Sequence, residues 1–585
     1  MKAKALLLLT LFYFTVKAQT PSSGEILLQL QRLSNPQRAL YLAAHPDDEN
    51  TRLIAWLANH KKAETAYLSL TRGDGGQNLI GAELGDALGL IRSHELVEAR
   101  RIDAGMQFFS RARDFGYSKS YQETESIWNR DSVLADMVKV LRSFRPQVVI
   151  TRFSPKPGGT HGHHTSSARL GLQAVQLAAQ KSYRPDLGPA WQVFRTLWNT
   201  SWWFFQSNPS ALQADSFSSV FVGHYIPERG MTIQEIAALA RSQHKSQGFG
   251  TMPAMLDTLE YFQVLQGPAF QTDPLDLLPN QLSNCSGGEP AQAILDSIIA
   301  GFNPREPHLH VPALFRFRAA LTKLADTSMA RQKKQATERL IQHCLGIRLQ
   351  ALASQPIAAI GDTLEFSLDY GQGLPADVRI TNIQWLGKGW QIIPGKYAPL
   401  GFPLQPRGRY SVKAKANSSA GLAQPYWLET PGTDGAFFAG SSQHTQATGQ
   451  FDPLCRVQLS WNGQTWHQSL PLIFVSKDPV KGEQQEAFRL LPQVTLNPGR
   501  PAAIALTNEA VDMPVLLKNH SSQPCSGQLR LASDSHWTIQ PTSTRINLPA
   551  GSSISLNLKL FPRKFDGKKS SLQLQFVSDD GQVFQ

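Results

Sequence analysis

A short polar cluster, residues 44–49 (AHPDDE), constrains the fold most, because it lies between two apolar patterns. The run 40–43 before it is typical of a strand, and the amphipathic run 51–60 after it is typical of a helix. Open α/β sheets bind ligands at such strand ends. His45 and Asp48 are three residues apart, so a tight turn can point both at one ion while Asp47 points elsewhere. The cluster predicts half of a metal site, although an aspartate here could also cap the helix.

A second polar cluster, residues 160–164 (THGHH), follows the apolar run 148–152 through a loop rich in proline and glycine. His161 and His164 repeat the three-residue spacing. If the two strands are neighbours in a parallel sheet, both clusters meet at one edge. Three nitrogen or oxygen ligands with an open position are the pattern of catalytic zinc. With a free carboxylate as base and a second histidine as oxyanion stabiliser, the clusters contain the parts for amide hydrolysis.

The first half of the chain alternates short apolar runs with helical periodicity, which favours a parallel sheet covered by helices. Strands are predicted at 40–43, 66–70 and 148–152, and helices at 51–60, 88–109, 133–144 and 166–179. There is no GxGxxG after the first strand, so a nicotinamide-binding domain is disfavoured.

With 585 residues, the chain is too long for one ordinary domain. We expect an α/β Rossmann-like domain at 19–275 and a helical extension at 276–345. Alternating strands broken by Gly and Pro then predict two β-sandwich domains of immunoglobulin-like size, at 346–478 and 479–585. These sandwiches could bind glycans or act as spacers, and the sequence does not reveal the oligomeric state.

The N-terminus resembles a targeting segment, residues 1–18. Lys2 and Lys4 precede an apolar run that is too short to span a membrane, and cleavage is expected before Gln19. This segment predicts export, to the periplasm or the extracellular space. We see no other membrane-spanning stretch in the sequence. The net charge of +12 comes from scattered basic residues, which indicates a solvated surface and not a nucleic-acid site.

The cysteines have no CxxC spacing, which argues against a zinc knuckle. Export permits disulfides, and the pairs Cys285–Cys344 and Cys455–Cys525 are one possibility. Buried free thiols are the alternative.

Residues 44–49 and 162–164 (GHH) resemble the start motif AHPDDE and the later H-x-x-H motif of the PIG-L/LmbE-like zinc N-deacetylases. The resemblance runs from about residue 40 to about residue 248. It includes 71–76 (TRGDGG), 92–96 (RSHEL, similar to the R-x-x-E helix) and 241–247 (RSQHKSQ, similar to the H-x-S-Q segment).

The resemblance implies a Zn²⁺ ion held by His45, Asp48 and His164. It implies Asp47 as general base and His161 as stabiliser of the tetrahedral intermediate and proton donor to the amine.

It also implies substrate contacts from Arg92, Asp74 and His244. Arg92 could instead pair with Glu95, and His244 could be a structural histidine near the pocket. His163 departs from the family pattern, which often has Asp at this position, and that puts the support of the catalytic histidine in doubt.

The implied activity is removal of an N-acetyl or other N-acyl group from an amino sugar or an N-acetylglucosamine-containing glycoconjugate. One alternative is a zinc amidase acting on another N-acyl compound. The other is a non-catalytic glycan-binding surface protein.

Overall fold

The computed structural model describes residues 21–585 apart from 159, 206–211, 213–215, 251, 254–257, 375–376, 396, 398, 439–444, 450–453, 500–508, 533–536 and 564–571. The expected signal peptide, residues 1–18, lies outside the described residues. The chain packs as an α/β unit, residues 21–345 with 424–450, and a β-rich unit, residues 346–423 with 451–585. Among the described helices, none has the length and apolar character needed to cross a bilayer.

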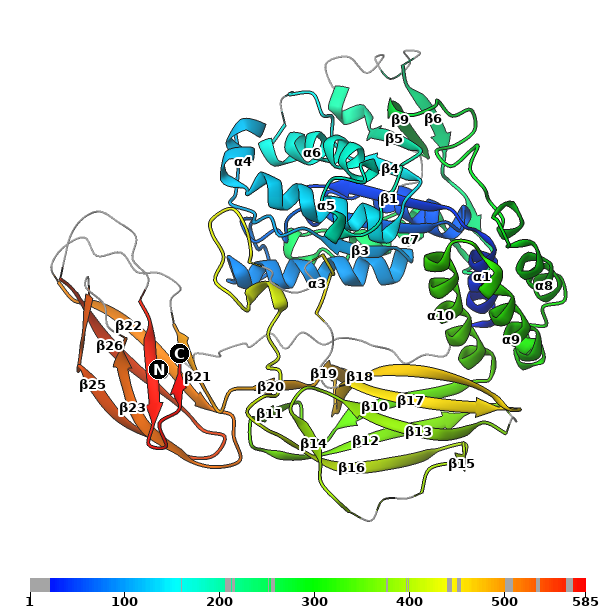
Figure 1. The fold of residues 1–585 in the computed structure, drawn as a ribbon. Coiled ribbons are helices and arrows are strands. Elements are labelled where there is room, and N and C mark those ends of the chain that lie inside the picture. The colour runs from blue at the N-terminus through cyan, green and yellow to red at the C-terminus, as the bar shows by residue number, and fades with distance from the viewer. Residues whose placement is uncertain are drawn as a thin grey trace. The chain divides into compact units, whose positions relative to one another are not determined.

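A seven-stranded sheet lies at the centre of the α/β unit (Figure 1). Its strand order is β3-β2-β1-β4-β5-β9-β6, in which the first five strands are parallel and the last two are antiparallel. The predicted parallel sheet is therefore present as the larger part of a mixed sheet. The strands are β1 (Arg38–Ala43), β2 (Glu64–Ser69), β3 (Met106–Phe109), β4 (Val148–Thr151), β5 (Arg195–Thr200), β6 (Ser218–Phe221) and β9 (Leu259–Gln266).

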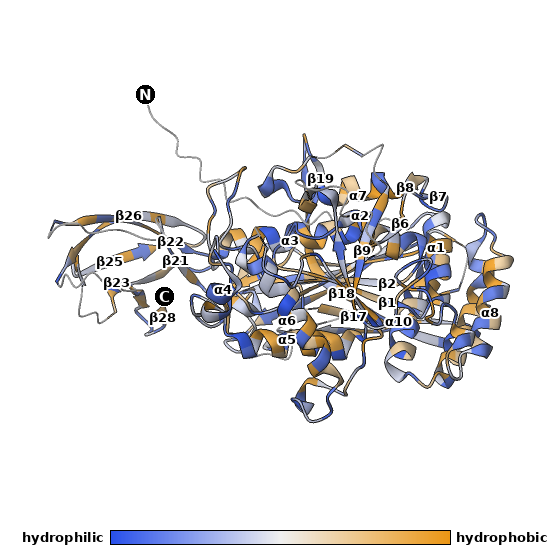
Figure 2. Cartoon of the chain, turned by 90° about the horizontal axis from the view of Figure 1, so that it is seen from above, coloured by the Kyte–Doolittle hydropathy of each residue, from blue (hydrophilic) through white to orange (hydrophobic). Residues whose placement is uncertain are grey.

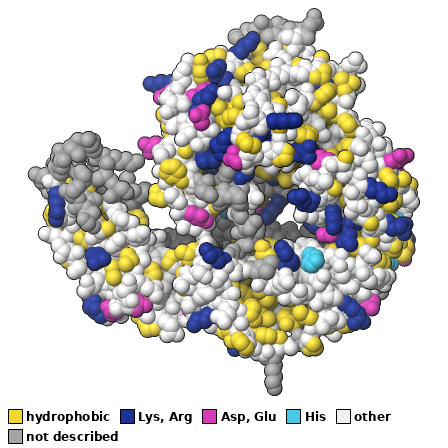
Figure 3. Space-filling model, in the orientation of Figure 1, with side chains coloured by type: hydrophobic (Ala, Val, Ile, Leu, Met, Phe, Trp, Pro, Cys, Tyr) yellow, Lys and Arg dark blue, Asp and Glu magenta, His cyan; other side chains and the backbone are white. Residues whose placement is uncertain are grey.

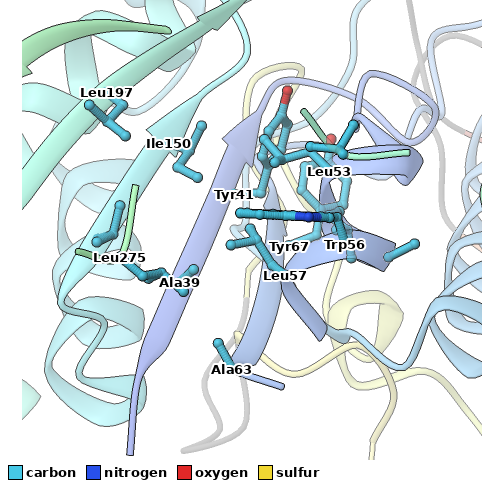
Figure 4. Packing of buried hydrophobic residues seen from close by; sticks show 14 of the residues in the cluster. Ala39, Tyr41, Leu53, Trp56, Leu57, Ala63, Tyr67, Ile150, Leu197 and Leu275 are labelled. Carbon is cyan, nitrogen blue, oxygen red and sulfur yellow. The ribbon is translucent and has the colours of Figure 1, made fainter. Parts of the chain in front are cut away.

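Side chains alternate between the two faces of β1 and so divide the core into two layers. Tyr41 packs with residues of α1, α2, α3 and α7, whereas Leu40 and Leu42 pack with α5 and α6. Figure 4 shows the first layer, where Trp56 lies beside Tyr67. The helices are α1 (Ser23–Ser34), α2 (Thr51–Ala55), α3 (Asp86–Asp103), α4 (Tyr121–Ile127), α5 (Arg130–Phe144), α6 (Gly162–Ala179) and α7 (Ile233–Arg241).

The predicted helix 88–109 is wrong at its end. Helix α3 stops at Asp103, Ala104 has a left-handed φ of +68°, and residues 106–109 form β3 beside β2. The apolar residues of this four-residue strand continue the helical pattern. A run this short is too brief to distinguish the periodicity of a strand from that of a helix.

The helical extension packs on the rest of the α/β unit through α1. The buried Lys333 Nζ donates to Leu33 O at 2.8 Å and to Asn35 O at 2.9 Å, where α1 ends. Hydrophobic and hydrophilic residues alternate around α8 in Figure 2, as expected for a helix with one buried face. The helices are α8 (Glu289–Ala300), α9 (Val311–Ala320) and α10 (Thr327–Cys344).

The first part of the β-rich unit contains a nine-stranded sheet and a separate two-stranded sheet of β11 and β20. Strand β19 pairs with β18, and β20 pairs with β11, so this part continues beyond the boundary expected at residue 478. Its strands include β10 (Ile347–Ala353), β11 (Ile357–Ala359), β12 (Thr363–Gln372), β13 (Arg379–Leu386), β14 (Trp390–Ile392), β15 (Phe402–Pro403), β16 (Gly408–Ala416), β17 (Leu454–Trp461), β18 (Gln464–Asp478), β19 (Gly482–Ala487) and β20 (Arg489–Leu491).

The second part of the β-rich unit is a sandwich of two four-stranded antiparallel sheets that share one core. Val515 from one sheet and Phe576 from the other are both fully buried in it. The sheets are β21-β22-β26-β24 and β25-β23-β27-β28, with β21 (Val494–Pro498), β22 (Val511–Asn519), β23 (Cys525–Leu531), β24 (Trp537–Gln540), β25 (Ser543–Leu548), β26 (Ser553–Pro562), β27 (Leu574–Ser578) and β28 (Val583–Phe584).

The structure contains all four cysteines as free thiols, and Cys344, Cys455 and Cys525 are buried. The structure therefore agrees with the alternative of free thiols, and neither Cys285–Cys344 nor Cys455–Cys525 is bonded. On the face shown in Figure 3, lysine and arginine side chains are scattered among other residues.

Candidate metal centre and active site

Both polar clusters lie where the strand order of the sheet changes direction. From β1 the chain continues to β2 and β3 on one side, and then returns to β4 and β5 on the other. His45 follows the end of β1, and the loop that leads to His161 follows β4. Because β1 and β4 are parallel neighbours, their carboxyl ends form the crevice in which such sheets bind ligands. The predicted meeting of the two clusters is therefore present in the structure.

His45, Asp48 and His164 form a group of possible metal ligands, one ligand atom of each lying within 4.8 Å of the others. Asp48 Oδ2 is 3.1 Å from His45 Nδ1, and Asp48 Oδ1 is 3.5 Å from His164 Nε2. Burial would raise the pKa of Asp48, but His164 and His45 outweigh it and hold that pKa below its usual value. Burial lowers the pKa of His164 to about 4, so its ring is neutral and has a lone pair to offer. Two imidazoles and one carboxylate are a donor set suited to zinc.

His163 contacts the candidate ligand His45. His163 is fully buried, its ring stacks on Trp128, and its Nδ1 is 2.9 Å from His45 Nε2. If His45 presents Nδ1 to a metal, its Nε2 carries the proton and donates it to His163, as outer partners of ligating histidines do. The residue that departs from the family pattern thus contacts a candidate metal ligand in this chain.

His161 lies beside this group and has its own support. The backbone N–H of His163 donates to His161 Nδ1 at 3.1 Å, and the backbone N–H of Ser118 donates to His161 Nε2 at 3.4 Å. Burial and the neighbouring His45 lower the pKa of His161. His45, His161 and His163 form a second group whose ligand atoms lie within 4.8 Å of one another. The structure therefore contains two possible ligand sets that share His45. A substitution at His161 or His164 can distinguish them.

Asp47 is held in an uncommon backbone conformation, with φ of +88°. Its N–H donates to Glu49 Oε2 at 2.9 Å, and its carboxylate is 3.2 Å from the Arg92 guanidinium. Positive φ is costly for most residues, and such strain persists where the surroundings impose it. Burial raises the pKa of Asp47 to about 6, against the opposing effect of Arg92. A carboxylate with this pKa suits a general base near neutral pH.

Arg92 is buried, 4% exposed, and holds the turn from inside. It donates to Pro46 O at 2.5 Å and to Gly73 O at 3.2 Å, besides pairing with Asp47. The guanidinium is not among the side chains that line the cavity, and the substrate contact that the resemblance implies stays a prediction. The alternative pair with Glu95 is also not formed, since that carboxylate accepts from Ser246.

Asp74 and His244 are also buried and are not among the residues that line the cavity, and their contact with substrate stays a prediction. Asp74 pairs with Arg113 at 3.3 Å and accepts from the backbone N–H of Asp114. His244 Nε2 lies 2.8 Å from Glu49 Oε1, which matches the alternative of a structural histidine.

Glu49 is the centre of a buried charge network. Its Oε1 faces Arg100 at 3.3 Å as well as His244, and Arg100 also pairs with Asp103. Burial would raise the pKa of Glu49, but His244 and Arg100 lower it to about 2. The three acids of the first cluster therefore have three different surroundings.

A cavity of about 510 Å³ opens beside Asp47, Asp48 and His164. Sequence reasoning missed the residues on its other sides. Arg152 directly follows β4 and so lies at the carboxyl end of a strand, as His45 does after β1. Its position was therefore a signal that could have identified it. The remaining lining includes Arg52, Phe153, Ser201, Gln234, Ala237, Arg241 and Phe249.

Residues 40–175 match the family model PIG-L, described as GlcNAc-PI de-N-acetylase. A 1D-myo-inositol 2-acetamido-2-deoxy-alpha-D-glucopyranoside deacetylase of Geodermatophilus obscurus is 36% identical over 180 residues, 28% of this chain and 60% of that protein. The deacetylase 2 of the same description from Saccharopolyspora erythraea is 27% identical, over 42% of this chain and 94% of that protein. The chain thus spans about 60% of the length of the first relative.

Among solved structures, the N,N'-diacetylchitobiose deacetylase of Pyrococcus horikoshii is 18% identical, with a TM-score of 0.27 over 36% of this chain and 70% of that one.

Proposed function

Because residues 40–175 form a domain of the PIG-L family, we propose that the chain is a zinc-dependent hydrolase that removes an N-acetyl group from an amino sugar or an N-acetylglucosamine-containing glycoconjugate. The observation that carries the proposal is the grouping of His45, Asp48 and His164 beside a cavity that Asp47, Asp48 and His164 line. The named relatives, which are deacetylases of an acetamido sugar, support the substrate class.

His45, Asp48 and His164 would hold the ion, and a zinc ion there lowers the pKa of a bound water and polarises a carbonyl. Asp47 accepts the proton of the water that adds to the amide carbon. His161 would stabilise the oxygen on which negative charge develops. The C–N bond then breaks as the nitrogen takes up the proton that Asp47 accepted, and acetate and a free amine are released.

The direct test is acetate release from N-acetylglucosamine glycosides by the zinc-loaded full chain. We expect release that stops when a chelator removes the metal and returns when zinc is restored. No release from any N-acyl sugar, with zinc bound, would favour a glycan-binding protein. Release only from N-acyl compounds that are not sugars would favour the other amidase.

Replacing His161 with alanine is expected to lower kcat by about 10²- to 10³-fold, the usual cost of losing one oxyanion donor. The zinc content should stay at the wild-type value, because the proposed ligands remain. Metal analysis and steady-state kinetics measure both quantities. His164→Ala is the matched control and should lose the metal. If His161→Ala loses zinc and His164→Ala keeps it, the ligand set is His45, His161 and His163 instead.

We also propose that the chain is exported. The basic and apolar pattern of residues 1–18 supports this, and its test is the N-terminus of the chain recovered outside the cytoplasm. A mature chain that begins at Gln19 is expected, and a chain that keeps Met1 in the cytoplasm would contradict export.

A further inference from the structure

The segment 424–450 lies in the sequence between β16 and β17 of the β-rich unit but packs with the α/β unit. In Figure 1 it is the yellow loop near α3. Phe109 N–H, in the edge strand β3, donates to Thr445 O at 3.1 Å, and Phe437 N–H donates to Arg111 O at 2.8 Å. Ala436 forms a bridge with Ala112. The segment therefore covers the β3 edge of the sheet, whose backbone groups would otherwise lack partners.

Its aromatic residues Tyr426 and Trp427 enclose the guanidinium of Arg72, which is 1% exposed. The guanidinium carbon lies 3.3 Å from the centre of the Trp427 ring, and on another side it lies 4.2 Å from the Phe109 ring. Arg72 donates to Tyr426 Oη at 2.9 Å and to the carbonyls of Ala447 at 3.2 Å and Gln446 at 3.3 Å.

Outside this segment, Arg72 donates a hydrogen bond to Ser93 Oγ of the α/β unit, at 3.1 Å. A buried guanidinium that loses hydrogen-bond acceptors costs free energy, so it would move without the segment. The segment is therefore the main partner of Arg72 among the described residues.

Arg72 stands next to Gly73, whose carbonyl accepts from Arg92. This contact is tight, because a Cβ added to Gly73 would lie 2.6 Å from an Arg92 nitrogen. Arg92 in turn holds Pro46 O and the carboxylate of Asp47. An unbroken series of contacts thus runs from the segment 424–450, through two buried arginines, to the proposed base.

We infer that Tyr426 and Trp427 are positioning residues for the deacetylase site: through Arg72 and Arg92, the segment 424–450 holds the turn that carries Asp47. The inference rests on the proposed function, and it assigns to a stretch of chain far from residues 40–175 a part in that domain's active site. Small displacements of a reacting group reduce rate strongly, since a shift of about 1 Å can cost on the order of 10²-fold.

The test uses zinc-loaded full chains with Trp427→Ala and Tyr426→Phe. We expect Trp427→Ala to lower kcat at least about 10-fold, with KM and zinc content unchanged, and Trp427→Phe to restore most of it. Tyr426→Phe removes one hydroxyl and should show a smaller loss in the same direction, which keeps the test valid if Trp427→Ala does not fold. The matched control is Phe438→Ala, an aromatic residue of the same segment that is 49% exposed, and it should behave as wild type.

Amide hydrogen exchange separates this inference from the proposed function. Faster exchange at residues 46–49 and 71–76 in Trp427→Ala, with zinc still bound, is the expected result whether or not the wild type releases acetate. Wild-type protein without deacetylase activity would overturn the proposed function. The exchange result would then still test whether the segment 424–450 holds the turn at Asp47. Unchanged exchange at residues 46–49, or full kcat in a folded Trp427→Ala, would overturn the inference.

Discussion

Replacing Asp47 with asparagine is expected to lower kcat by about 10²- to 10⁴-fold, the usual contribution of a positioned general base. The zinc content should not change, because Asp47 is outside the proposed ligand set. Asparagine is the informative replacement here, since Asn, like Asp, tolerates positive φ better than most residues and so keeps the backbone at φ of +88°. It also keeps an oxygen that faces Arg92, so the loss reports on proton transfer.

Steady-state kinetics with metal analysis measures this effect. Asp131→Asn is the matched control, because that side chain is 93% exposed and distant in sequence from both clusters. A zinc-loaded Asp47→Asn protein that keeps more than a tenth of the wild-type kcat would show that another group accepts the proton. His161 would then be the next candidate.

Replacing Glu49 with glutamine is expected to lower the free energy of unfolding of the α/β unit by roughly 3 kcal/mol at neutral pH. Arg100, His244 and Glu49 are all buried, so the change removes the carboxylate that Arg100 and His244 share, while Arg100 keeps only Asp103 among the acids that the structure describes. The pKa of Glu49 is about 2 in the folded chain and 4.5 ordinarily. Because the folded value is the lower one, the stabilisation is present above pH 4.5 and is lost as the pH falls towards 2.

Chemical denaturation of metal-free chains at several pH values tests this prediction. The difference between wild type and Glu49→Gln should shrink as the pH is lowered through that window. Glu98→Gln is the matched control, because Glu98 pairs with Arg101 at the surface and such pairs contribute about 0–1 kcal/mol. Equal effects of the two substitutions would contradict a special role of the buried network.

The candidate metal site was predictable because each half of it is encoded locally. The turn after β1 and the loop after β4 each place histidines at a strand end, and parallel neighbouring strands bring such ends together. Arg92 shows the limit of this reasoning. Its motif indicated importance, but only packing reveals that it points inward to Pro46 and Asp47 and not to the cavity. The same limit applies to Glu49, whose partners His244 and Arg100 are distant in sequence.

The sequence by itself placed both polar clusters at strand ends, and the family resemblance then selected His45, Asp48 and His164 as the candidate donor set. Only the tertiary structure decided what surrounds that set: His163 behind His45, the buried network around Glu49, and the segment 424–450 beside Arg72. The physical reason is the range of the interactions. Strand ends and turns follow from neighbouring residues, whereas burial and charge pairing depend on contacts between segments up to 375 residues apart, as between Arg72 and Ala447.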